Sequence, residues 1–121
     1  MNKKTLVIGA SPNPERYANK AARLLAQYGH STELFGQKKG DIDGKVIQNR
    51  FPEQIEDLDS VTLYLNPDNQ KTLEDKIIAL KPKRIIFNPG TENPAFVEKA
   101  QKAGIHTEEA CTLVLLHTGQ Y

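Results

Sequence analysis

The sequence predicts an α/β fold in which a parallel five-stranded sheet carries helices on both faces. Short apolar runs alternate with amphipathic stretches along the whole chain, and a strand–helix–strand succession of this kind builds parallel sheets. Gly, Pro or Asn ends most of the apolar runs, which have the length of strands buried on both faces. The 121 residues suffice for one domain. We therefore expect a single Rossmann-like domain over residues 1–121.

The first third of the chain is expected to contain a strand, a helix and a second strand. The apolar run 5–8 stops at Gly9, which predicts a buried strand. Apolar residues recur at three- and four-residue spacing over 14–28, which predicts a helix with one buried face. Asn13 is the expected N-cap because its side chain can accept from a free amide, and a proline suits the first helical position. Residues 31–35 predict the second strand.

The rest of the chain repeats this alternation. A polar loop with two glycines leads into a short extended piece, and three further strand predictions alternate with two helix predictions. The expected elements are, in order, a loop over 38–44, an extended piece over 45–47, one helical turn over 51–55, a strand over 60–65, a helix over 67–80, a strand over 84–87, a helix over 93–103 and a strand over 105–107. The apolar segment 110–117 fits either a helix or a strand.

Composition and charge restrict the class of partner. Lys and Arg number 16 against 15 Asp and Glu, a net charge of +1, and a domain that binds nucleic acid usually has a larger basic excess. No apolar run approaches the roughly 20 residues that cross a bilayer. Cys111 is the single cysteine, so no internal disulfide can form, as is usual in a reducing compartment. We therefore expect a cytoplasmic protein that binds neither nucleic acid nor a membrane.

Ligands of such sheets bind at the carboxyl ends of the strands, where the strand order reverses. The first loop there begins Gly9-Ala10-Ser11 and lacks the second and third glycines of the dinucleotide fingerprint G-x-G-x-x-G. It can still bind an anion, because glycine permits a tight turn and the following helix directs free amides and its positive dipole end at the loop. Ser11 can add a hydroxyl donor and Arg16 a charge-assisted hydrogen bond. We expect a phosphate site here; the alternative is a well-capped turn with a solvated Arg16.

The second loop distinguishes between ligands. A domain that binds NAD usually has Asp or Glu at the end of the second strand, where the carboxylate holds a ribose hydroxyl. Here that strand is followed by Gly36, Gln37, Lys38 and Lys39. Two cations in place of a carboxylate favour a ribose that carries a phosphate, as in NADP or coenzyme A. The alternative is that both lysines are solvated residues of an exposed loop.

No catalytic constellation is recognisable. The sequence contains no G-x-S-x-G elbow and no His-Glu-x-x-His or paired-cysteine metal motif. The histidines His30, His106 and His117 are expected to be structural or exposed, and Cys111 to be a small core residue rather than a nucleophile. These features favour binding over catalysis, and we predict no catalytic and no metal-binding residue.

Several segments together resemble one family. They are Leu6 to Pro12 with Arg16 and Asn19, the pair Gly29-His30, Ile42-x-Gly44, the stretch from Ile55 to Val61, Asn88-Pro89-Gly90, and Ala103-Gly104-Ile105 before Cys111. In this order they resemble the small bacterial CoA-binding proteins, whose domain is similar to the N-terminal part of the succinyl-CoA synthetase α subunit. The resemblance covers nearly the whole chain. It implies a Rossmann-like fold that binds coenzyme A at the carboxyl ends of the strands.

The resemblance also implies which residues would meet coenzyme A. The first loop would hold the pyrophosphate, the end of the second strand the phosphorylated ribose and adenine, and the third and fourth loops the rest of the groove. The predicted binding residues are Gly9, Ala10, Ser11, Pro12, Arg16, Gln37, Lys38, Lys39, Asn66, Pro67, Pro89 and Gly90.

The predicted function is a coenzyme A or acyl-CoA binding protein that is non-catalytic or regulatory. Its predicted ligand is a small molecule, and the sequence leaves open whether it has a protein partner. An NADP(H)-binding oxidoreductase or redox sensor is one alternative. A protein-interaction module that has lost its ligand is the other, because Phe35-Gly36-Gln37 replaces the Val-Asn-Pro type of ending that many relatives have after the second strand.

Overall fold

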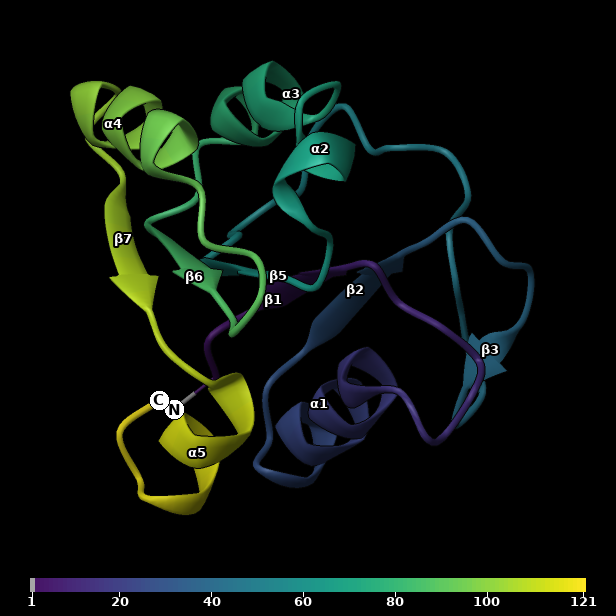
Figure 1. The fold of residues 1–121 in the computed structure, drawn as a ribbon. Coiled ribbons are helices and arrows are strands. Elements are labelled where there is room, and N and C mark those ends of the chain that lie inside the picture. The colour runs from purple at the N-terminus through teal and green to yellow at the C-terminus, as the bar shows by residue number, and fades with distance from the viewer. Residues whose placement is uncertain (1) are drawn as a thin grey trace.

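Five parallel strands form the sheet at the centre of the computed structural model, which describes residues 2–121 (Figure 1). Their spatial order is β2-β1-β5-β6-β7. The elements are β1 (Thr5–Ile8), α1 (Tyr17–Gln27), β2 (Thr32–Phe35), β3 (Asp41–Ile42), β4 (Lys45–Val46), β5 (Ser60–Leu63), α2 (Pro67–Gln70), α3 (Glu74–Ala79), β6 (Arg84–Phe87), α4 (Pro94–Lys102), β7 (His106–Glu109) and α5 (Thr112–His117). The short β3 and β4 form a separate antiparallel hairpin. The predicted five-stranded parallel sheet is confirmed.

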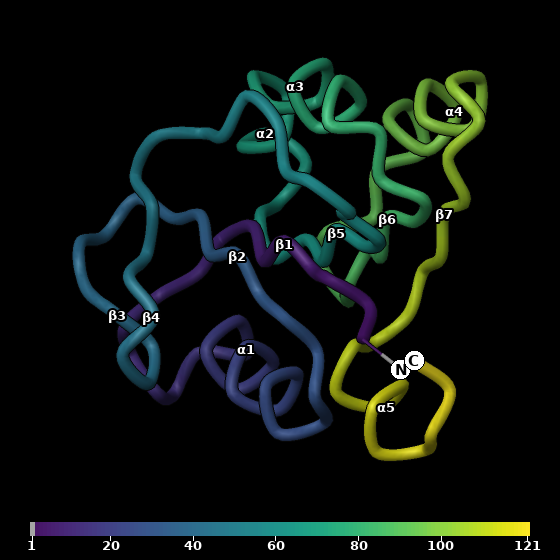
Figure 2. The backbone as a smooth tube through the Cα atoms, turned by 180° about the vertical axis from the view of Figure 1, so that it is seen from behind, coloured from purple at the N-terminus to yellow at the C-terminus, as the bar shows by residue number. Residues whose placement is uncertain are grey.

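Helices cover both faces of this sheet, as predicted. Helices α1 and α5 lie together on one face, and α2, α3 and α4 lie on the other (Figure 1 and Figure 2). Strand β1 pairs with β2 on one side and with β5 on the other. The chain therefore crosses one face after β1 and the opposite face after β5. The carboxyl ends of β1 and β5 flank the point where the strand order reverses, which is where open α/β sheets bind ligands.

Alternate residues of the strands pack against the two layers of helices. Phe87 of β6 and Phe96 of α4 are fully buried and pack edge to face, with ring centroids 5.6 Å apart. On the other face Val7 of β1 packs in one cluster with Ala22 and Leu25 of α1. Full burial of a large apolar side chain contributes about 1.5–3 kcal/mol to stability. These two layers fix the strands, so a rigid scaffold positions the loops at their ends.

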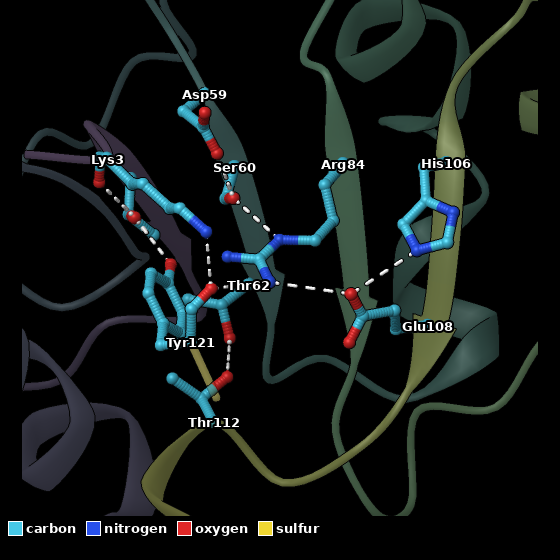
Figure 3. A network of polar contacts seen from close by, with 10 residues as sticks. Lys3, Asp59, Ser60, Thr62, Arg84, His106, Glu108, Thr112 and Tyr121 are labelled. Atoms are coloured by element: carbon cyan, nitrogen blue, oxygen red, sulfur yellow. Dashed lines mark hydrogen bonds and ion pairs between the residues drawn. The ribbon is translucent and has the colours of Figure 1, made fainter. Parts of the chain in front are cut away.

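A polar network lies at the amino ends of the strands (Figure 3). This end of the sheet is opposite to the carboxyl ends, where open α/β sheets bind ligands. Arg84 donates from Nε to Ser60 Oγ at 2.8 Å and from Nη1 to Glu108 Oε1 at 3.4 Å. Its Cζ atom lies 4.3 Å from the centroid of the Tyr121 ring. The Tyr121 hydroxyl is 2.6 Å from Thr5 Oγ1. The network thus holds residue 121 against β1 and β6 and has a structural role.

Helix α1 begins later than predicted. Its N-cap is Arg16, not Asn13. The Asn13 side chain instead closes a turn of its own, because its Oδ1 accepts from the Glu15 amide at 2.9 Å and its carbonyl accepts from the Arg16 amide at 3.1 Å. Asparagine often forms such local turns in competition with a helix. The prediction of a helix from residue 14 was therefore wrong, and the first helical residue is Tyr17.

The single helix predicted over 67–80 is two helices, α2 and α3, with a turn at 71–73 between them. The break follows Gln70, whose side chain bonds two loop carbonyls. No helical turn forms over 51–55. Smaller differences concern element ends: the strand predicted over 60–65 ends at Leu63, the last strand covers His106–Glu109 instead of 105–107, and the segment 110–117 contains the helix α5.

Candidate functional site

The loops after β1, β2, β5 and β6 surround one pocket of about 400 Å³ at the point where the strand order reverses. Most of the predicted binding residues come together there. The pocket is lined by Gly9, Ala10, Ser11, Arg16, Gln37, Lys38, Asn66, Pro89 and Gly90 from that set. The remaining three, Pro12, Lys39 and Pro67, do not line it. Pro12 instead packs against Gly40, where a Cβ atom would lie 2.8 Å from the proline ring.

Sequence reasoning missed several residues of this pocket. They are Tyr17, Ala18, Tyr64, Leu65, Asn69 and Thr91. The first two were missed because the predicted helix started too early, which placed them inside the helix instead of at its open end. Tyr64 and Leu65 were assigned to a strand that ends sooner, at Leu63. Their position after an apolar run and just before Asn66-Pro67 is the signal that could have identified them.

Gly9 allows the loops after β1 and β5 to approach each other. Its φ is +94°, a conformation that other residues rarely adopt. A Cβ atom there would also lie 3.0 Å from the Tyr64 carbonyl oxygen. The amides of Gly9 and Ala10 both donate to the Phe35 carbonyl at 2.9 Å. These two amides are therefore already paired, although both residues line the pocket.

Free amides come instead from the start of α1. The first amides of a helix have no partner within it, and those of Tyr17 and Ala18 make no other main-chain hydrogen bond within residues 2–121. The Ser11 hydroxyl accepts from the Asn13 amide at 3.2 Å, so its own proton is free to be donated. Asn19 is buried and donates from Nδ2 to the Ser11 carbonyl at 2.9 Å, which ties the loop to the helix. Ser11, Tyr17 and Ala18 all line the pocket.

Two cations and no carboxylate line the pocket. Arg16 and Lys38 are exposed, and within residues 2–121 neither side chain forms an ion pair or a hydrogen bond. No Asp or Glu is among the lining residues. The positive end of the α1 dipole adds to this charge. The pocket therefore attracts an anion.

The loop after β2 is held by the segment that follows β4. Gly36 donates its amide to the Gln48 carbonyl at 3.0 Å, and its own carbonyl accepts from Asn49 Nδ2 at 2.8 Å. A smaller hollow of about 170 Å³ adjoins the pocket at this end, since both share Gly9, Gln37, Leu65 and Asn69. The combined groove runs from β2 across β1 and β5 to the loop after β6.

Tyr64 is a titratable residue of the pocket whose pKa is changed by burial. Burial raises the pKa of Tyr64 to about 12, and the nearby hydroxyls of Thr112 and Thr62 oppose part of that rise. Those two hydroxyls bond one another at 2.8 Å, and the buried Tyr64 hydroxyl makes no hydrogen bond within residues 2–121. A neutral phenol with this pKa is no base at neutral pH. Tyr64 is also one of the lining residues of the pocket.

Groups that commonly carry out catalysis lie elsewhere. No His and no Cys lines the pocket. The His30 ring accepts at Nδ1 from the Lys3 amide at 2.9 Å, at the amino end of the sheet. In the described residues 2–121 no group of three His, Cys, Asp or Glu side chains is placed to hold a metal ion. The arrangement is suited to holding an anionic ligand by hydrogen bonds and charge.

The fold and this ligand edge define a Rossmann-like α/β domain. Residues 3–117 match the family of CoA binding domains. The chain belongs to that family, whose domain is of the type at the N-terminus of succinyl-CoA synthetase. The resemblance found in the sequence is confirmed.

Solved structures show the same fold. The protein in one of them, a crystal structure of an uncharacterized protein, is 48% identical to this chain. The match covers 100% of this chain and 99% of that protein, with a TM-score of 0.97. A Thermus thermophilus protein is 24% identical, and the match covers 98% of this chain and 90% of that protein with a TM-score of 0.84. A hypothetical protein from Pyrococcus horikoshii is 25% identical, and the match covers 98% of this chain and 82% of that protein with a TM-score of 0.83. No curated protein matches the chain.

A membrane-crossing helix is also not found. None of the helices in the part of the chain that the structure describes is both long enough and apolar enough to span a bilayer.

Proposed function

We propose that this chain is a single domain that binds coenzyme A or an acyl-CoA without carrying out a reaction on it. One observation carries the proposal: a single pocket combines the open start of α1, the Ser11 hydroxyl and the unpaired cations of Arg16 and Lys38, with no carboxylate among its lining residues. Membership of the CoA binding domain family supports this choice of ligand over other phosphorylated compounds.

The phosphates would bind at the start of α1. The pyrophosphate would accept from the amides of Tyr17 and Ala18 and from the Ser11 hydroxyl, with Arg16 adding a charge-assisted bond. Lys38 lies in the loop after β2, where a Rossmann-like fold places the ribose of a nucleotide. Its ammonium would pair with the 3′-phosphate of coenzyme A. Lys39 does not line the pocket and would contribute only distant charge.

The pantetheine arm would run from the pyrophosphate toward the loop after β6. Leu65, Pro89 and Gly90 line that part of the groove and provide apolar contacts and main-chain groups. No Asp, Glu, His or Cys is among the lining residues, so the groove offers no general base and no activated nucleophile. This composition supports recognition rather than catalysis.

Competition between nucleotides tests the proposal. Native mass spectrometry of the protein mixed with equal amounts of coenzyme A, NADP and NAD would show which one it retains. The proposal predicts a mass increase that corresponds to one coenzyme A. Retention of NADP would favour an oxidoreductase or redox sensor instead, and the absence of any complex would favour an interaction module that has lost its ligand.

A further inference from the structure

Gln70 joins two neighbouring loops that both line the pocket. It is the last residue of α2 and is fully buried. Its Nε2 donates to the Leu65 carbonyl at 2.8 Å and to the Thr91 carbonyl at 2.9 Å. Leu65 follows β5, Thr91 follows β6, and both line the pocket. One side-chain amide thus sets the distance between these loops.

The Gln70 amide can take only one orientation. Both hydrogens of Nε2 are used, and Oε1 accepts from Asn93 Nδ2 at 2.9 Å. A flipped amide would place Oε1 against two carbonyl oxygens and Nε2 against another NH2 group, so all three bonds would be lost. A buried amide persists where its groups are paired in this way. The side chain of Gln70 is therefore locked between the two loops.

The hydrogen bonds continue from the pocket wall into the sheet. Thr91 Oγ1 donates to the Asn88 carbonyl at 2.7 Å, and Asn88 Nδ2 donates to the Leu63 carbonyl at 2.8 Å. Asn88 is buried, and its Oδ1 accepts from the Thr112 amide at 2.9 Å. The loop after β6 is thus fixed to β5 at its base by Asn88 and at its rim by Gln70.

We propose that Gln70 is a positioning residue for the pantetheine half of coenzyme A. It acts by holding the Leu65 and Thr91 walls at a fixed separation and, being fully buried, it does not line the pocket itself. This inference rests on the proposed function. The nucleotide half is assigned to the start of α1 and to Lys38, which Gln70 does not hydrogen-bond. Loss of the Gln70 bonds therefore weakens the hold on pantetheine and spares the nucleotide half.

The variant Gln70→Glu tests this inference, because it keeps the size of the side chain but turns a carboxylate toward two carbonyl oxygens. Calorimetry compares coenzyme A with adenosine 3′,5′-bisphosphate, which lacks the phosphopantetheine arm. We expect the affinity for coenzyme A to fall about tenfold, as for the loss of a buried hydrogen bond, and that for the bisphosphate to stay within about twofold. Gln27→Glu makes the same chemical change at an exposed site at the end of α1 and should match the wild type with both ligands.

Equal losses for both ligands would indicate a general structural role and overturn the inference, as would an unchanged affinity of Gln70→Glu for coenzyme A. If Gln70→Glu does not fold, Gln70→Asn carries the test, since its shorter amide cannot reach both carbonyls; thermal unfolding shows whether it is folded. Wild-type protein is titrated separately. Its failure to bind coenzyme A would contradict the proposed function itself, which distinguishes that failure from a failure of the role of Gln70.

Discussion

Gly36 and Ala10 approach each other so closely that no side chain fits between them. A Cβ atom on Gly36 would lie 2.1 Å from the carbonyl oxygen of Ala10. Gly36 follows β2 and Ala10 follows β1, so this contact joins the two loops that we propose to hold the nucleotide half of coenzyme A. The same approach lets the Phe35 carbonyl accept from the amides of Gly9 and Ala10. The shape of the pocket at this end depends on a glycine outside the dinucleotide fingerprint.

Gly36→Ala should therefore destabilise the fold and weaken coenzyme A binding. Gly36 is not among the glycines with positive φ, so the cost is steric, about 1–3 kcal/mol as for other over-packed sites. Urea unfolding measures the change. Gly104→Ala is the control: its φ is +83° but it has open space around it, so only backbone strain is expected and the affinity stays unchanged. Wild-type stability and affinity in Gly36→Ala would contradict the close approach.

Arg16→Ala should weaken coenzyme A binding by about 1–3 kcal/mol, as expected for the loss of a hydrogen bond to a charged group. The effect should shrink as salt is added, because Arg16 is exposed and its charge is screened. Calorimetric titration at two salt concentrations measures both. Arg50→Ala removes an equally exposed arginine that does not line the pocket. Equal affinities of these two variants would remove Arg16 from the binding site.

Tyr64→Phe should leave the free energy of unfolding at neutral pH within about 1 kcal/mol of the wild type, because the hydroxyl it removes makes no hydrogen bond within residues 2–121. Affinity for coenzyme A should also be unchanged, since the aromatic ring and its packing are kept. A large loss of stability would show that the hydroxyl is bonded after all.

Alkaline pH gives a second readout for Tyr64. Burial raises its pKa to about 12 from the ordinary 10.0, so the folded state favours the neutral hydroxyl. This contribution is complete below pH 10 and is lost as the pH rises toward 12. Urea unfolding over this range should show a steeper loss of stability in the wild type than in Tyr64→Phe. Identical slopes would contradict the raised pKa.

His30 should make stability fall as the pH drops below neutral. Burial, followed by nearby positive charges that include Lys3 and Arg84, lowers the pKa of His30 below its ordinary 6.5. The folded state thus binds fewer protons than the unfolded state, and the stability present above pH 6.5 is lost as the pH falls through that value toward the folded pKa. His30→Gln keeps a hydrogen-bond acceptor but does not titrate. Its free energy of unfolding should fall less between about pH 7 and about pH 5.5, and an equal fall in both proteins would contradict this assignment.

The strands and the ligand edge could be predicted because both depend on local signals. Apolar runs that end at Gly or Asn mark buried strands, and parallel strands place their carboxyl ends at one edge of the sheet. Knowing that edge was enough to choose Ser11, Arg16 and Lys38, which the structure brings to one pocket. The choice of coenzyme A as the proposed ligand came only from the resemblance to a family, because NADP and coenzyme A both carry a ribose phosphate.

The remaining details depend on contacts between residues distant in sequence. The start of α1 was misjudged because Asn13 suits both a helix N-cap and a local turn, and the turn forms. The sequence pattern predicts only that Gln70 is a helical residue, yet its side chain donates hydrogen bonds to carbonyls of two different loops. The need for glycine at position 36 arises from Ala10, 26 positions earlier in the chain. Periodicity and residue spacing contain no signal for such contacts.

Calorimetric titration of the wild type and of Lys38→Ala with coenzyme A and 3′-dephospho-CoA tests the central claim most directly. We expect the wild type to bind coenzyme A about tenfold more tightly than the dephosphorylated compound, as for one charge-assisted hydrogen bond. This preference should disappear in Lys38→Ala and persist in Lys39→Ala, because Lys38 alone of the two lines the pocket. Absence of coenzyme A binding by the wild type, or tighter binding of NADP in a parallel titration, would contradict the account.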